Sequence, residues 1–210
     1  RGPAAARYGS GAMGGVVNLV PKKNPHESSV SLNYYTNQPQ DDDEGATNRV
    51  GFNLSGPIVK DVLSFRIYGS ANKTDADDAN INAAAGNADA AGVEGVRNKD
   101  IAGRLHWKIN PAQSLTFDAG FSRQGNIYNG DTQNSDTHPA AEALRTSLIG
   151  SETARLYRSN FALTHTGAWD WGDTKSYISY DRTNYCRLPE YLAGGPEGSY
   201  SSDEFTNSYL

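Results

Sequence analysis

The sequence predicts an all-β fold that forms part of a transmembrane antiparallel β-barrel. Three observations lead to this prediction. Beyond residue 27, segments of about ten residues alternate apolar and polar side chains with a period of two, as strands with two different faces do. Gly, Asn, Asp and Pro separate these segments, and short turns alternate with long polar connections. The sequence contains no run of ~18 apolar residues that would form a membrane-spanning helix.

Seven strands follow from the alternation. They are expected at residues 28–36, 48–55, 62–72, 100–110, 114–123, 155–169 and 175–187. Short turns are expected at 56–61, 111–113 and 170–173. Long polar connections are expected at 74–98 and 126–153, and the remainder from Glu190 is expected to be a loop.

The strand expected at 100–110 shows the alternation most clearly. One face would carry Ile101, Gly103, Leu105, Trp107 and Ile109, and the other would carry Arg104, His106 and Lys108. Outer-membrane barrels expose the apolar face to lipid and have short periplasmic turns and long extracellular loops. A soluble β-sandwich shows similar alternation and stays open as an alternative on pattern alone.

Composition and charge exclude other classes of protein. Hydrophobic residues make up only 37% of the 210 residues, which is unlike an ordinary soluble domain. The net charge of −5, without clustered Lys and Arg, argues against a nucleic-acid partner. Three tryptophans fit the aromatic girdle of a membrane barrel, although a buried core would also use them. These are Trp107, Trp169 and Trp171.

Four local features of the sequence have other chemical interpretations. Gly9, Gly11 and Gly14 match a dinucleotide-binding fingerprint, but the following residues read as a strand and not as the required helix. The acidic run 41–44 reads as a solvated loop, with calcium binding as the less favoured interpretation. The histidines lack metal-ligand spacing and form no recognisable catalytic arrangement. Cys186 is either a plain small residue or half of a disulfide whose partner lies outside this sequence.

The first residues read RGPAAARYGSGAMGGVVNL, which resembles the end of the plug domain of TonB-dependent outer-membrane receptors. The sequence is similar in particular to the family of ferric enterobactin receptors. Further stretches that carry this resemblance are 45–47, 97–101, 120–128, 130–134, 155–158 and 192–195. The resemblance therefore covers almost the whole sequence.

The resemblance implies a receptor in the cell outer membrane of a Gram-negative bacterium, which takes up a ferric catecholate siderophore such as enterobactin. Residues 1–23 would be the end of the plug domain, and residues 24–210 would be the N-terminal part of the barrel. The implied partners are the siderophore, outer-membrane lipid, and TonB with its inner-membrane complex acting through a plug start that this fragment lacks. The resemblance implies no enzyme activity and no cofactor, because iron enters as part of the siderophore complex.

The resemblance also implies three ligand-binding residues: Tyr128, Arg158 and Arg187. Arginine and tyrosine suit an anionic ligand with flat catechol rings, because guanidinium carries a permanent charge and both side chains stack. Arg158 starts one long strand and Arg187 ends the next, so antiparallel pairing would bring both to one end. The sequence departs from the family by carrying Leu144 and Leu148 in the loop after Tyr128. The runner-up is a passive porin or adhesin barrel without energised transport.

Overall fold

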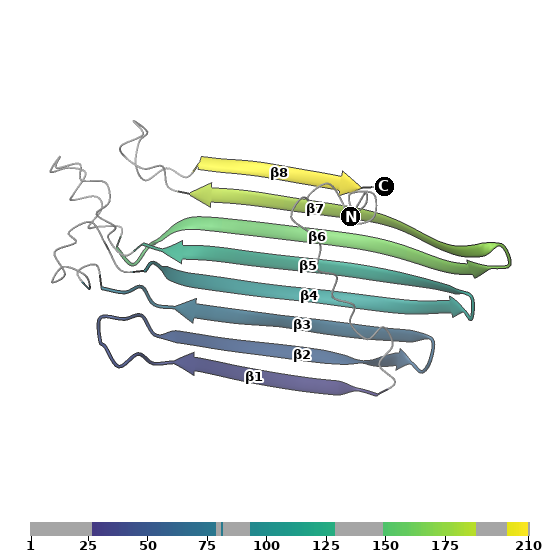
Figure 1. Cartoon of the computed structure of the whole chain (residues 1–210), viewed down its shortest axis with the longest axis horizontal. Helices are drawn as coiled ribbons and strands as arrows, with labels where there is room; N and C mark the ends of the chain where they lie inside the picture. The colour runs from purple at the N-terminus through teal and green to yellow at the C-terminus, as the bar shows by residue number, and fades with distance from the viewer. Residues whose placement is uncertain (1–26, 79–80, 82–92, 129–148, 188–200, 210) are drawn as a thin grey trace, which may run out of the picture.

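The computed structural model describes residues 27–78, 81, 93–128, 149–187 and 201–209. These residues form one antiparallel sheet of eight strands in sequence order, in which each strand pairs with its neighbour along the chain (Figure 1). The strands are β1 (Ser29–Asn37), β2 (Thr47–Val59), β3 (Leu63–Thr74), β4 (Gly95–Asn110), β5 (Gln113–Ile127), β6 (Glu152–Trp169), β7 (Gly172–Arg187) and β8 (Ser201–Tyr209).

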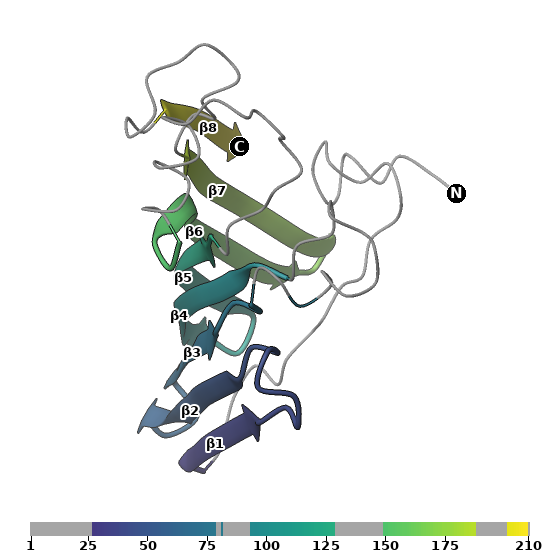
Figure 2. The same cartoon turned by 90° about the vertical axis from the view of Figure 1, so that its left-hand side faces the viewer.

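The sheet is a single twisted layer. Figure 2 shows the strands following one another along the layer, with β1 and β8 at opposite edges, and the order of pairing contains no contact that would close the sheet. Among the described residues, no helix has the length and apolar character needed to cross a membrane. The described part therefore has two faces and two edges, as expected of a segment of a larger sheet.

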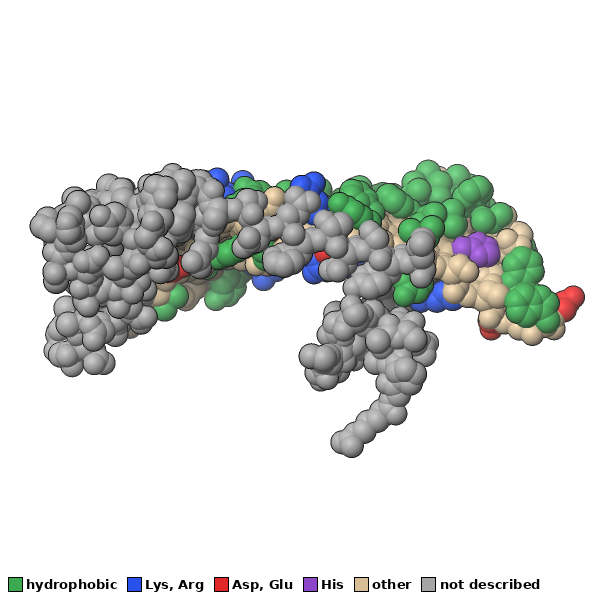
Figure 3. Space-filling model, turned by 90° about the horizontal axis from the view of Figure 1, so that it is seen from above, with side chains coloured by type: hydrophobic (Ala, Val, Ile, Leu, Met, Phe, Trp, Pro, Cys, Tyr) green, Lys and Arg blue, Asp and Glu red, His purple; other side chains and the backbone are tan. Residues whose placement is uncertain are grey.

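The pairing register sorts the side chains onto an apolar face and a polar face, because directly paired residues project to the same side of a sheet. On β4 and β5, Leu105 pairs with Phe117 and Ile101 pairs with Phe121. The apolar face also carries Val30, Leu32, Val50, Phe52, Leu54, Leu63, Phe65, Ile67, Trp107, Leu115, Phe161, Leu163, Ile178 and Tyr180. Figure 3 looks along the layer and, towards the turn end, shows a group of hydrophobic side chains on one side of it.

The apolar face is uncovered in the described structure. Leu32 is 76% exposed and Phe117 is 44% exposed, and Ile127 is the one buried hydrophobic side chain among the described residues. A soluble β-sandwich would bury this face under a second sheet, which the described residues do not provide. The fold therefore agrees with the predicted barrel segment, whose apolar face is solvated by lipid.

Three short turns lie at one end of the strands, which we call the turn end, and the long connections lie at the other, the loop end (Figure 1). In the β2–β3 turn, Asp61 adopts a φ of 59°, a left-handed conformation that Asp tolerates better than most residues. In the β4–β5 turn, the Asn110 side chain accepts a hydrogen bond of 2.9 Å from the Ala112 amide. In the β6–β7 turn, the Trp169 indole donates to Thr174 at 2.8 Å.

All seven predicted strands are confirmed. β1 is shifted by one residue from its predicted bounds, and the other six extend beyond their predicted bounds at one end or both, most clearly at the start of β4. The prediction of a loop from Glu190 onward is wrong for Ser201–Tyr209, which forms β8 against β7. That segment consists mainly of Ser, Asp, Glu, Thr and Asn, so its strand depends on pairing with β7 and has no hydrophobic alternation of its own. The predicted plug end at 1–23 lies outside the described residues.

Candidate functional site

Tyr128 lies at the loop end, directly after β5. Its amide donates to the Ser151 carbonyl at 3.0 Å, and its carbonyl accepts from the Gly150 amide at 2.8 Å. These two bonds continue the pairing of β5 with β6 beyond Ile127. The backbone of Tyr128 is thereby fixed at the point where the long β5–β6 connection leaves the sheet.

Arg158 lies on the polar face of β6, where its backbone pairs with Ser122 of β5 and Thr183 of β7. Its guanidinium binds the carboxylate of Asp181 through two nitrogens, with Nε 3.0 Å and Nη2 2.5 Å from Oδ2. The Arg158 side chain is nevertheless 59% exposed, whereas that of Asp181 is 25% exposed. The ion pair therefore holds the arginine in a defined orientation while more than half of its side-chain surface stays open to solvent.

Arg187 is the last residue of β7, and its backbone pairs with Ala154 of β6. Ala154 pairs on its other side with Asn126 of β5, two residues before Tyr128. Thr183, the partner of Arg158, lies four residues from Arg187 along β7, a separation of about 13 Å. The register thus brings the three predicted positions to the loop end of three adjacent strands, as antiparallel pairing was expected to do. The side chain of Arg187 lies outside the described structure.

Asp181 is the residue at this end that sequence reasoning missed. Its backbone pairs with Asn160, so it lies diagonally from Arg158 on the same face. The alternation within the predicted strand 175–187 is enough to place Asp181 on the same face as Arg187. The ion pair of Asp181 with Arg158 also depends on how β6 and β7 are aligned, which the alternation does not give. A tight turn of known length at 170–173 was the one signal that could have fixed this register.

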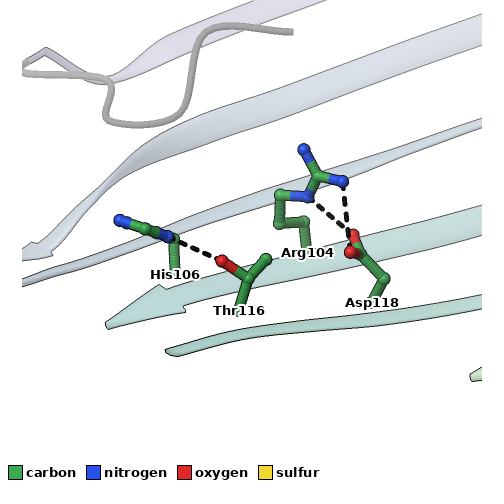
Figure 4. Close-up of polar contacts among 4 residues, drawn as sticks. All are labelled: Arg104, His106, Thr116 and Asp118. Atoms are coloured by element: carbon green, nitrogen blue, oxygen red, sulfur yellow. Dashed lines mark hydrogen bonds and ion pairs between the residues drawn. The ribbon is translucent and has the colours of Figure 1, made fainter. Parts of the chain in front are cut away.

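A second polar cluster lies on the same face towards the turn end (Figure 4). Arg104 binds Asp118 through two nitrogens, at 2.6 Å and 3.1 Å, and the buried His106 lies 2.9 Å from the Thr116 hydroxyl through Nδ1. The cluster also includes Ser114, Thr164, Thr166 and Lys175. Its hydrogen bonds join neighbouring strands. Across the described residues, no group of three His, Cys, Asp or Glu could hold a metal ion.

A third charged group lies at the loop end of the apolar face, beyond the apolar side chains. The Glu152 carboxylate accepts hydrogen bonds from Arg123 and, at 3.0 Å, from Arg155, and its side chain is only 7% exposed. Burial raises the pKa of Glu152, but the hydrogen bonds and charges of the two arginines outweigh burial and hold that pKa below its ordinary value of 4.5. Glu152 is therefore a carboxylate at neutral pH.

Other sequence features have modest structural roles. The acidic run 41–44 is an exposed turn between β1 and β2, as predicted, and the Asp43 amide donates to the Asp41 carboxylate at 3.1 Å. The Cys186 thiol lies on β7 and donates to the Asn184 side chain at 3.1 Å. Trp107, Trp169 and Trp171 are exposed at the turn end, consistent with the predicted girdle. The Gly9 to Gly14 motif lies outside the described residues.

No model of a protein family matches the sequence. Among curated proteins, the probable TonB-dependent siderophore receptor PirA of Acinetobacter baumannii is 54% identical over 202 residues, which are 96% of this chain and 26% of that protein. The ferric enterobactin receptor PirA of Pseudomonas aeruginosa is 50% identical over 97% of this chain and 27% of its own length. The ferrienterobactin receptor of Escherichia coli is 49% identical over 96% of this chain and 28% of its own length.

Solved structures of siderophore receptors also resemble this chain. The crystal structure of the siderophore receptor PirA from Acinetobacter baumannii matches 99% of this chain with 53% identity and a TM-score of 0.80, over 29% of that receptor. A ferric enterobactin receptor mutant of Pseudomonas aeruginosa, solved in complex with enterobactin, matches with 43% identity and a TM-score of 0.76 over 31% of its length. The chain thus spans between a quarter and a third of the receptors that it resembles.

Proposed function

We propose that this chain is part of a TonB-dependent siderophore receptor, since it is 49–54% identical to such receptors over nearly its whole length, and that the whole protein imports a ferric catecholate siderophore across the cell outer membrane. The proposal includes the predicted ligand contacts by Tyr128, Arg158 and Arg187. The main observation that supports the proposal is the position of Arg158. Its exposed guanidinium lies on the polar face at the loop end and is held in place by Asp181. In a closed barrel, that face lines the lumen and that end opens to the outside.

The chemistry of the three side chains suits the ligand. A ferric tris-catecholate is a compact anion with flat aromatic faces, so it offers both charge for arginine and rings for stacking. A permanent charge at positions 158 and 187 attracts the anion, and Tyr128 adds an aromatic surface at the rim. Asp181 opposes this attraction, because a fixed carboxylate beside Arg158 repels an anionic ligand. Affinity therefore depends on the balance of charge at the loop end.

The remaining features of the proposal concern transport. Residues 1–23 are proposed to be the end of a plug domain, and residues 24–210 the N-terminal part of the barrel. TonB and its inner-membrane complex are the proposed source of energy, acting on the plug. Iron is cargo bound within the siderophore and not a cofactor of the protein, and no catalytic step is proposed. The relatives' names support a receptor over a passive porin or adhesin.

This function is tested by measuring which class of ferric siderophore the receptor binds. The intact receptor that contains this chain is purified in detergent, and binding of a ferric tris-catecholate and of a ferric hydroxamate is measured separately by tryptophan fluorescence quenching. We expect saturable catecholate binding and at least about 100-fold weaker hydroxamate binding, since a specific site discriminates by several kcal/mol. Equal affinity for the two complexes, or binding of neither, would overturn the proposed substrate.

A further inference from the structure

Two arginines lie opposite each other on the polar face, nearer the turn end than Arg158. Arg66 of β3 pairs directly with Arg104 of β4, so their Cβ atoms are expected to lie about 5 Å apart. Like charges in this arrangement destabilise a sheet. Natural proteins keep an unfavourable local choice mainly where function requires it. The arginine pair therefore indicates a role beyond the fold.

Of the two charges, that of Arg104 is neutralised within the sheet. Its guanidinium binds Asp118 of β5 through two nitrogens (Figure 4). Arg66 turns the other way, and its Nε donates to the uncharged side chain of Asn53 on β2 at 2.8 Å. Arg66 has no ion-pair partner among the described residues. Its positive charge is therefore available to an anion on the polar face.

An aromatic ring and two small residues lie beside the arginine pair on its loop-end side. Tyr68, Ala102 and Gly120 pair in one row across β3, β4 and β5, about 7 Å along the strands from Arg66 and Arg104. The Tyr68 ring is 43% exposed, and the Arg66 guanidinium lies 5.1 Å from its centre. We call Arg66, Tyr68, Ala102, Arg104 and Gly120 the inner seat. It combines an exposed ring and a free positive charge with two positions that lack bulky side chains.

The inner seat adjoins the proposed siderophore site. Its row continues on β6 with Asn160 and on β7 with Asp181, the ion-pair partner of Arg158. Along the strands, Arg104 lies four residues, or about 13 Å, further from the loop end than the row of Arg158. A ligand that moves along this face from the loop end to the turn end therefore passes Arg158 first and the inner seat next.

Acidic side chains keep the region of the inner seat close to neutral. Asp118 neutralises Arg104, and Asp100 lies in the next row toward the loop end, where it accepts hydrogen bonds from the amide and hydroxyl of Ser70. Binding of an anion is then weak. Weak binding suits a site on a transport path, because a ligand in transit must be able to leave each site that it enters.

We infer that the inner seat binds one catecholate ring of the ferric siderophore during its passage through the lumen. The ring would stack on Tyr68, and its negatively charged oxygens would lie beside the guanidinium of Arg66. The inference rests on the proposed function and adds a second, weaker site that the ligand reaches after it leaves Arg158. Loss of the inner seat should therefore slow import without changing the affinity measured at the loop end.

The test measures import and binding separately in cells that carry the intact receptor. Import is the initial rate of uptake of a radiolabelled ferric tris-catecholate at saturating concentration, per receptor copy. Binding is the dissociation constant of the same complex in de-energised cells. We expect Arg66→Gln to slow import by at least about fivefold and to change the dissociation constant by less than about twofold. Arg66→Lys keeps the charge and should import at about half the wild-type rate or faster.

Two further variants separate a role in transport from a role in the fold. Tyr68→Leu should also slow import, whereas Tyr68→Phe, which keeps the ring, should not. Arg66→Gln removes the repulsion from Arg104, so its unfolding in denaturant should require at least as much denaturant as that of the wild type. Slower import by a receptor of undiminished stability would then come from the lost contact with the ligand.

Lys60→Gln is the matched control, because it removes one positive charge from an exposed position in the β2–β3 turn. It should import at the wild-type rate. Wild-type import by Arg66→Gln, an equal loss in Lys60→Gln, or a parallel loss of affinity in Arg66→Gln would overturn the inference. Entry of a bulky antibiotic through Arg66→Gln without ligand would also overturn it, by assigning Arg66 to contact with the plug. A wild-type receptor that binds no ferric catecholate would overturn the proposed function as well, whereas the other outcomes leave that function standing.

Discussion

Arg158 and Asp181 form a two-pronged ion pair across β6 and β7, with Nε and Nη2 of the guanidinium 3.0 Å and 2.5 Å from the same carboxylate oxygen. The pair orients Arg158 but also places a negative charge beside a residue proposed to bind an anion. An exposed pair of this kind contributes little to stability, because water and salt screen it. Its main effect is therefore expected on the ligand and not on the fold.

Asp181→Asn should tighten binding of the ferric catecholate by about three- to tenfold, because it removes one like charge near the anion while the amide still fills the same volume. Titration of the purified receptor with the ferric complex measures this effect, and repeating the titration at high salt should shrink it. Weaker binding in Asp181→Asn would show that orientation of Arg158 by the carboxylate matters more than the repulsion.

Glu152→Gln should lower the free energy of unfolding by about 1–3 kcal/mol at neutral pH, because a buried carboxylate that binds two arginines is replaced by a neutral amide. Denaturant unfolding of the receptor in micelles measures the difference from wild type. The same substitution at Glu94, whose carboxylate accepts one hydrogen bond from Asn126, serves as the control and should cost less.

The effect of Glu152 should depend on pH in a defined direction. Its pKa in the folded state lies below the ordinary 4.5, so its contribution is fully present above pH 4.5 and is lost as the pH falls through the lowered value. The stability difference between wild type and Glu152→Gln should therefore be constant from neutral pH down to about 4.5 and shrink below it. A difference that persists unchanged in strong acid would contradict the proposed charge pairing.

Gly69→Ala and Gly103→Ala provide a matched test of packing on the apolar face. A Cβ at Gly69 would lie 2.4 Å from the Asp100 carbonyl oxygen, whereas at Gly103 its nearest neighbour would be the Arg66 carbonyl oxygen at 3.8 Å. We expect Gly69→Ala to destabilise the barrel by about 1–3 kcal/mol and Gly103→Ala to change stability by less than about 0.5 kcal/mol. Equal effects in denaturant unfolding would show that the β3–β4 register is wrong.

Adjacent residues of β6 test which face meets lipid. Leu163 is on the apolar face opposite Phe117, and Ala162 is on the polar face opposite Asp118. Leu163→Arg should cost about 2–4 kcal/mol of folding free energy in bilayers, whereas Ala162→Arg should cost much less, because the lumen is wet. Folding into vesicles, followed by denaturant titration, measures both costs. A larger cost for Ala162→Arg would reverse the assignment of the two faces.

Strands whose side chains alternate strongly could be predicted from the sequence, because their two faces differ in chemistry along the whole strand. In β5, for example, Leu115, Phe117 and Phe121 lie on one face and polar residues lie between them. The prediction failed for Ser201–Tyr209, whose residues lack that contrast and whose strand depends on a partner. The predicted strands are also too short, since β4 begins at Gly95 with five residues that lack clear alternation and that pairing with β3 and β5 holds extended.

The candidate site was predictable only in part. Alternation and strand order sufficed to bring Arg158 and Arg187 to the same end, and the sheet confirms that placement of their backbones. The ion pair with Asp181 and the binding of Glu152 by two arginines depend on the pairing register of the strands. Alternation does not fix this register, because shifting a strand by two or four residues leaves every side chain on the same face. Pairing places Lys99 beside Arg123 on the apolar face, a position that the predicted strand 100–110 did not include.

The measurement that tests the central claim most directly is ferric catecholate binding to the intact receptor with Arg158→Ala plus Arg187→Ala, compared with Lys108→Ala plus Lys175→Ala. Both double variants remove two positive charges, but the control pair lies nearer the turn end. We predict a loss of affinity of at least about 100-fold in the first variant, since each charge-assisted contact contributes about 1.5–3 kcal/mol, and a change of less than about twofold in the control. Unchanged affinity in the first variant, or an equal loss in both, would contradict a catecholate site at the loop end.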